Sequence, residues 1–126
     1  MTQKSQQWLV QANYDFDTAE FMFKGGRYFY TVFMCHLAIE KAFKGIYQQK
    51  FNEPPPRTHN LGYLINKLEL KPPTKIGKFL IKINQASVRT RYPEDLDQLQ
   101  KYYTLDTVRL LLDQTRETIE WIKKLY

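Results

Sequence analysis

The sequence contains a single cysteine, Cys35, and only two histidines, His36 and His59. One cysteine excludes an internal disulfide, and the clustered His, Cys and paired-acid spacings that metal sites need are missing. The chain also lacks a glycine-rich phosphate loop and a serine nucleophile elbow. We therefore expect no metal site and no bound cofactor.

Long apolar runs are equally scarce. No uninterrupted apolar stretch approaches the roughly 20 residues that a membrane span needs, and no N-terminal segment has the order of charges, apolar residues and small residues of a secretory signal. With the lone cysteine, this predicts a cytoplasmic protein with no membrane association. The length of 126 residues fits one domain, so we expect a single helical domain over residues 1–126.

Aromatic residues are plentiful, with nine Tyr, eight Phe and two Trp. This is more than one small core usually hides, so we expect some of them at a subunit interface or a ligand cleft.

Gly and Pro residues divide the chain into segments with helical periodicity, and no strand pattern is present. We predict four long helices, at about residues 5–24, 27–50, 74–92 and 104–126, and a short helix after His59. Ser5 and Thr74 are the expected N-caps of the first and fourth helices. The stretch from Glu94 to Tyr103, acidic and then aromatic, is predicted to be a loop. The fold class is therefore all-α, an antiparallel four-helix up-and-down bundle with an additional short helix.

The segment from Lys71 to Arg91 contains no acidic residue and carries a charge equal to the net +6 of the whole chain. A helical period places one polar stripe along it: Lys75, Lys78, Lys82, Gln85 and Arg89. The opposite face is apolar: Ile76, Phe79, Leu80, Ile83 and Ala86. A localised basic surface of this kind attracts phosphate, although a solvated lysine face is the alternative interpretation.

No face of the second helix has a solvated character, so we expect this helix at the centre. One side has only small residues, which allow another helix to approach closely: Thr31, Cys35, Ala38, Ala42 and Gly45. Another side is apolar except for two ionisable groups: Phe29, Phe33, His36, Glu40 and Tyr47. We expect the part of this side from Phe29 to Glu40 to form a homodimer interface.

Three ionisable side chains are candidates for chemistry. His36 and Glu40, spaced i and i+4, form either an acid/base pair or a structural pair. His59 lies in Thr58-His59-Asn60-Leu61 after a proline-rich loop, where Thr58 or Asn60 caps the next helix. There His59 is either a structural loop residue or a catalytic one.

Three motifs together resemble the HEPN domain, the higher-eukaryote and prokaryote nucleotide-binding domain. They are Ala38-Ile39-Glu40-Lys41-Ala42-Phe43-Lys44, Thr58-His59-Asn60-Leu61, and Arg91-Tyr92-Pro93. The resemblance spans nearly the whole chain, including the order of the helices. It implies a helical bundle that dimerises around a basic cleft for nucleotide or RNA.

Many members of that family are metal-independent endoribonucleases, often toxins neutralised by a small nucleotidyltransferase encoded alongside. Their active site uses an Arg followed, after a gap of roughly four to six residues, by a His. This chain departs from the pattern, because no histidine follows Arg89 or Arg91. Arginine is always charged and stabilises a phosphorane but does not take a proton, so Glu40 or His59 would have to supply the base.

We therefore predict a homodimeric nucleotide- or RNA-binding module of a toxin–antitoxin-like system, with a nucleotidyltransferase-type partner. The predicted phosphate-binding residues are Arg89, Arg91, Lys82 and Lys44, with Tyr92 stacking on a base or ribose. The first alternative is a metal-independent endoribonuclease toxin whose atypical site includes the catalytic candidates Glu40, His59 and Arg91. The second is a structural adaptor between proteins. Without a partner, we expect little or no ribonuclease activity.

Overall fold

The structure, a computed structural model, describes residues 2–89 and 92–126. Within these described residues, six α-helices and one 3₁₀ helix follow one another: α1 (Gln3–Lys24), α2 (Tyr28–Phe51), α3 (Leu61–Lys67), α4 (Thr74–Arg89), η1 (Pro93–Asp95), α5 (Leu96–Tyr102) and α6 (Leu105–Lys123). The all-α prediction is confirmed. In this described part of the chain, no helix combines the length and apolar character needed to cross a membrane.

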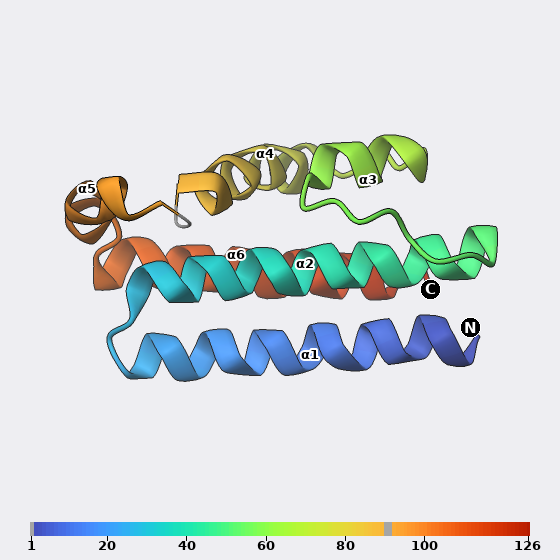
Figure 1. The fold of residues 1–126 in the computed structure, drawn as a ribbon, viewed down its shortest axis with the longest axis horizontal. Coiled ribbons are helices and arrows are strands. Elements are labelled where there is room, and N and C mark those ends of the chain that lie inside the picture. Colours follow the sequence, from blue (N-terminus) through green and yellow to red (C-terminus); the bar gives the residue numbers. More distant parts are fainter. Residues whose placement is uncertain (1, 90–91) are drawn as a thin grey trace.

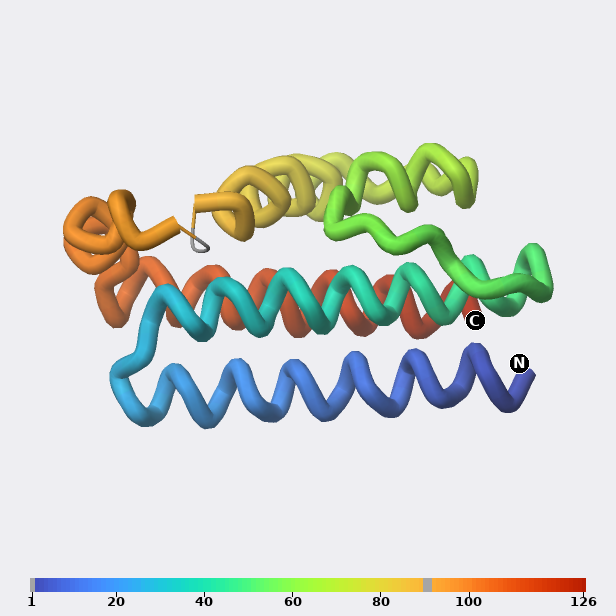
Figure 2. Tube along the Cα trace, in the orientation of Figure 1, coloured from blue at the N-terminus to red at the C-terminus, as the bar shows by residue number. Residues whose placement is uncertain are grey.

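Helix α2 lies at the centre of the bundle. In Figure 1, α1 runs along one side of α2, α6 lies behind it, and α3 and α4 cover the opposite side. The four long helices alternate in direction along the chain, and both termini lie at the same end (Figure 2). Most of α2 is consequently buried, including Val32, Ile39 and Phe43 at 0% exposure. The sequence prediction of a central second helix is confirmed.

The small-residue side of α2 allows close contact with the chain termini. Thr31, Cys35, Ala38 and Ala42 are fully buried. At Gly45 an added Cβ would overlap the Tyr126 hydroxyl and lie 3.0 Å from the carbonyl oxygen of Ser5. The Tyr126 hydroxyl occupies that space because it donates a hydrogen bond to the carbonyl oxygen of Ala42. Gly45 thus fixes the distance between α2 and both ends of the chain.

Helix α4 has the predicted two faces. Ile76, Phe79, Leu80, Ile83 and Ala86 are buried, whereas the basic stripe of Lys75, Lys78, Lys82, Gln85 and Arg89 is exposed. Thr74 is the first helical residue and not the predicted N-cap, since the Gly77 amide donates to the carbonyl oxygen of Pro73 at 2.8 Å.

Two of the predicted boundaries are wrong. Helix α1 begins at Gln3, because the Thr2 hydroxyl accepts the hydrogen bond from the Ser5 amide and Thr2, not Ser5, is the N-cap. The predicted loop from Glu94 to Tyr103 is instead η1 followed by α5. Burial of Leu99 and Tyr103, at 3% and 6% exposure, stabilises that short helix against the rest of the bundle.

Candidate functional site

The carboxylate of Glu40 is the centre of a polar cluster on the buried side of α2. Its Oε2 accepts a hydrogen bond from Lys44 Nζ at 3.0 Å, one helical turn further along. Its Oε1 lies 2.9 Å from His59 Nδ1 and 3.9 Å from His36 Nδ1. Glu40 itself is only 2% exposed. Since a buried charge must be paired and hydrogen-bonded, Lys44 and His59 compensate the carboxylate together.

His59 lies at the end of the proline-rich loop, just before α3 begins at Leu61, and from there its ring reaches Glu40. The Asn60 side chain accepts from the Tyr63 amide and caps α3, as predicted for this motif, and the Thr58 hydroxyl accepts from the Asn60 amide. A carboxylate only accepts hydrogen bonds, so the hydrogen shared with Glu40 belongs to His59 Nδ1. Nε2 is thereby left for a ligand, and the side chain is 63% exposed.

Asn84 of α4 joins this region to the start of α3. Its Oδ1 accepts from the Leu61 amide at 3.0 Å and lies 3.4 Å from His36 Nε2. Its Nδ2 donates to Asn60 Oδ1 at 3.3 Å. The Leu61 amide is one of the donors that a helix start leaves without an intrahelical acceptor, so Asn84 anchors α3 on α4.

A pocket of about 360 Å³ opens beside the exposed edge of His59. It is lined by the segment before α3, the end of α4 and the residue before η1: Thr58, His59, Asn60, Asn84, Ser87, Val88 and Tyr92. Tyr92 is 52% exposed. An imidazole and a phenol ring thus border the same cavity, which is a favourable environment for a planar, hydrogen-bonding ligand.

Three of the other predicted phosphate-binding residues, Arg89, Lys82 and Lys44, are not among the residues that line this pocket. Arg89 is exposed and its Nη2 donates to Gln98 Oε1 of α5 at 3.0 Å. Lys82 is exposed on the basic stripe. Lys44 is 7% exposed and does not line the pocket, since its ammonium binds Glu40. Arg91 lies outside the described residues.

The structure corrects the expected interface on α2. His36 is fully buried and Glu40 nearly so within one chain, because α3, α4 and the His59 segment cover them. The prediction that these two residues meet a second subunit is therefore wrong. Phe29 and Phe33 on the same side are half-buried.

Sequence reasoning identified Glu40 and His59 separately but not their contact, and it missed Asn84. A usable signal for Asn84 exists, since asparagine is a poor residue for a helix interior and here adjoins the apolar Ile83.

Chemically, the cluster offers an oriented imidazole beside an open cavity. Among residues 2–89 and 92–126, no group of three His, Cys, Asp or Glu side chains is suited to hold a metal.

Comparison with known proteins identifies one family and one fold. The family model described as the HEPN domain matches residues 5–125. The crystal structure of TT1696 from Thermus thermophilus is 20% identical, covers 99% of this chain and 100% of that chain, and has a TM-score of 0.83. The crystal structure of ST0689, an archaeal HEPN homologue, is 22% identical with complete coverage of both chains and a TM-score of 0.75. No curated protein sequence matches significantly.

Proposed function

The chain belongs to the HEPN domain family, and from this premise we propose that it binds a nucleotide or single-stranded RNA in the pocket between His59 and Tyr92. The observation that supports this most is the placement of both rings on one cavity of about 360 Å³. Aromatic rings of this kind stack on bases, and base stacking contributes about 1–3 kcal/mol per base.

The charge around the pocket suits a phosphate. Arg89 follows Val88, a lining residue, and the stripe of Lys75, Lys78 and Lys82 extends from it along α4. Arg91 immediately precedes Tyr92 in sequence, so we assign it the same role. Guanidinium groups bind phosphate with two parallel hydrogen bonds, which makes them more selective than the lysines.

Glu40 and Lys44 act in this proposal through His59. The carboxylate fixes the hydrogen on Nδ1 and the ring orientation, and Lys44 holds the carboxylate. His59 Nε2 then faces the ligand as an acceptor for a hydroxyl or, when the ring is protonated, as a donor to phosphate.

Binding is tested with a fluorescently labelled short single-stranded RNA by anisotropy at low and moderate salt. Arg89→Ala and Arg91→Ala should each weaken binding, and affinity should fall steeply with salt, because phosphate contacts release counterions. Lys124→Ala removes the same charge from an exposed site near the C-terminus and serves as the control. Unchanged affinity in the Arg89/Arg91 double variant would mean that the basic stripe is only a solvated surface and would favour the adaptor alternative.

We also propose that the protein forms a homodimer and acts with a nucleotidyltransferase-type partner in a toxin–antitoxin-like system. The family resemblance and the exposed aromatics support the dimer, among them Phe21 at 73% and Tyr14 at 71% exposure. Sedimentation at tens of micromolar tests the dimer, and a monomer at that concentration would contradict it.

The partner is tested by looking for an adjacent nucleotidyltransferase reading frame whose product co-purifies with the chain.

A specific observation also favours the endoribonuclease alternative. The contact between Glu40 and His59, at 2.9 Å, resembles the carboxylate–imidazole arrangement of general bases. In such a reaction His59 Nε2 takes the 2′-hydroxyl proton as the 2′-oxygen bonds to phosphorus. The bond to the 5′-oxygen breaks and that oxygen takes a proton from water, while Arg89 or Arg91 stabilises the phosphorane.

A further inference from the structure

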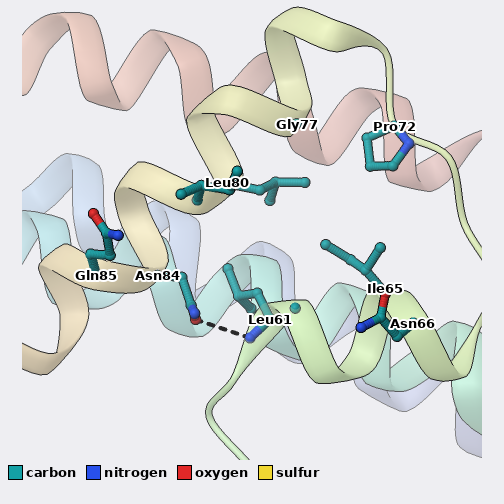
Figure 3. A pocket seen from close by; sticks show the side chains of 10 residues that line it. Leu61, Ile65, Asn66, Pro72, Gly77, Leu80, Asn84 and Gln85 are labelled. Carbon is teal, nitrogen blue, oxygen red and sulfur yellow. Dashed lines mark hydrogen bonds between the residues drawn. The ribbon is translucent and has the colours of Figure 1, made fainter.

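A second cavity, which shares the lining residue Asn84 with the His59 pocket, lies between α3 and α4. It encloses about 340 Å³. Leu61 and Ile65 of α3 and Leu80 of α4 border it, and Pro72 lies at one end (Figure 3). The hydrogen bond from the Leu61 amide to Asn84 holds the two helices together at the other end (Figure 3).

Gly77 keeps this cavity open. It lies in the first turns of α4, where glycine costs about 1 kcal/mol relative to alanine. An added Cβ would meet only the Pro72 Cβ at 4.0 Å, an ordinary contact. Neither packing nor backbone conformation therefore requires a glycine, whereas a larger side chain would fill space in the cavity.

Three exposed apolar side chains of α3 and α4, which we call the apolar seam, lie in or near this cavity. Ile81 lines the cavity yet is 64% exposed, and Val88, two turns further, is 56% exposed. Tyr63 of α3 is 43% exposed on the neighbouring helix. An apolar surface that extends beyond its cavity fits a series of side chains on a partner segment better than one small ligand.

The charges beside the seam are mostly positive, although Lys75 is paired with Glu117 of α6 at 3.4 Å. Between Leu61 and Arg89 the sequence has one acidic residue, Glu69, and six basic residues: Lys67, Lys71, Lys75, Lys78, Lys82 and Arg89. The basic stripe is exposed, with Lys78 next to Gly77 and Lys82 next to Ile81 in sequence. A partner of opposite charge gains in encounter rate and orientation from such a border.

We propose that the groove between α3 and α4 docks an acidic amphipathic helical segment of a partner protein. Apolar side chains of the segment enter the cavity at Gly77 and lie along Ile81, and its carboxylates face the lysines of α4. The groove adjoins the His59 pocket and shares Asn84, Val88 and the basic stripe with it, whereas Gly77 and Ile81 line the groove and not that pocket.

The probe is a short labelled helical peptide with leucines along one face and glutamates on both flanks, measured by fluorescence anisotropy. The wild-type protein should bind it and should not bind the peptide with lysines in place of the glutamates. Ile81→Glu should weaken binding by at least about tenfold, since it places a charge in the seam. Gly77→Leu should do the same by filling the cavity.

Val10→Glu is the matched control, because Val10 on α1 is exposed to 61% and receives the same charge. Its affinity for the acidic peptide should equal that of the wild type. The proposal is overturned if Ile81→Glu binds like the wild type, or if both Glu variants lose affinity alike. It is also overturned if the acidic peptide does not bind, if Ile81→Glu turns a dimer into a monomer, or if anionic vesicles but not the peptide bind at Ile81.

Discussion

At the scale of single residues, the Glu40 carboxylate connects three parts of the chain. Lys44 binds it from the next turn of α2, His59 binds it from the loop before α3, and His36 lies 3.9 Å away. Removing the Glu40 charge would leave Lys44 buried without its acceptor, which typically costs about 3–5 kcal/mol of folding free energy. A Glu40 substitution would therefore change stability and function together, so functional tests belong on the exposed His59.

Gly45 gives a prediction about packing. Gly45→Ala should reduce the free energy of unfolding by about 1–3 kcal/mol, because the new methyl group displaces Tyr126 and presses on the Ser5 carbonyl oxygen. Gly77→Ala is the control, since it meets only an ordinary contact and should increase stability by about 0.5–1 kcal/mol. Urea denaturation measures both. Equal effects of the two substitutions would contradict the close approach at Gly45.

Cys35 gives a prediction about pH. Burial raises the pKa of its thiol from 9.0 to about 12, against a smaller lowering effect from a hydrogen bond with Thr115. The folded protein therefore keeps this proton at pH values where the unfolded chain loses it. The contribution of Cys35 to the free energy of unfolding is fully present below pH 9 and decreases as the pH rises from 9 towards 12.

The corresponding measurement is thiol labelling at pH 8. Cys35 should react with a thiol reagent only after denaturant unfolds the chain, because thiolate and access are both lacking in the folded state. Rapid labelling of the folded protein would contradict the burial of α2.

At this scale the sequence indicated the candidate residues of the site but not the contacts between them. Glu40 and His59 were identifiable as ionisable residues in unusual surroundings. Their pairing depends on how the proline-rich loop returns the chain across α2, and a path of 19 residues between them leaves no local pattern. Asn84 was missed for the same reason, since its partners Leu61 and Asn60 belong to another part of the chain.

At the scale of helices, α3 depends on α4 for its position. It has only seven residues, too few for an isolated helix to be stable in water. Asn84→Leu should therefore destabilise the protein by about 1–3 kcal/mol, because the buried Leu61 amide loses its acceptor.

Hydrogen exchange measures this effect locally. The Leu61 and Tyr63 amides should exchange faster in Asn84→Leu, while the amides of α1 should be unaffected. Asn66→Leu, which replaces an exposed asparagine on α3, is the control. Unchanged exchange at Leu61 would mean that apolar packing of Leu61 and Leu64 alone holds α3.

The long helices were predictable because they are long, periodic and separated by Gly and Pro. Helix α5 was not, because Glu94 and Asp97 suggest a solvated segment and the helix has only seven residues. The spacing of Leu96, Leu99 and Tyr103 was the available signal, since it places three apolar side chains on one face. Burial of Leu99 and Tyr103 outweighed the weak local propensity.

At the scale of the whole molecule, the family pattern bears on activity. The chain has no histidine after Arg89 or Arg91, so we expect little or no RNA cleavage by the purified protein without a partner. Labelled RNA incubated with the protein in EDTA and separated on a gel tests this. Cleavage that disappears in His59→Ala, with the fold retained, would establish the endoribonuclease alternative in place of the binding module.

The most direct test of the proposed function is an amide NMR titration with a short single-stranded RNA. We predict saturable shifts at the amides that border the pocket, from Thr58 to Asn60 and at Val88 and Tyr92, with loss of these shifts in the Tyr92→Ala variant. Amides of α1 around Ala12 should stay unchanged. No shift in the pocket, or shifts confined to Lys75, Lys78 and Lys82 that vanish with moderate salt, would contradict nucleotide or RNA binding between His59 and Tyr92.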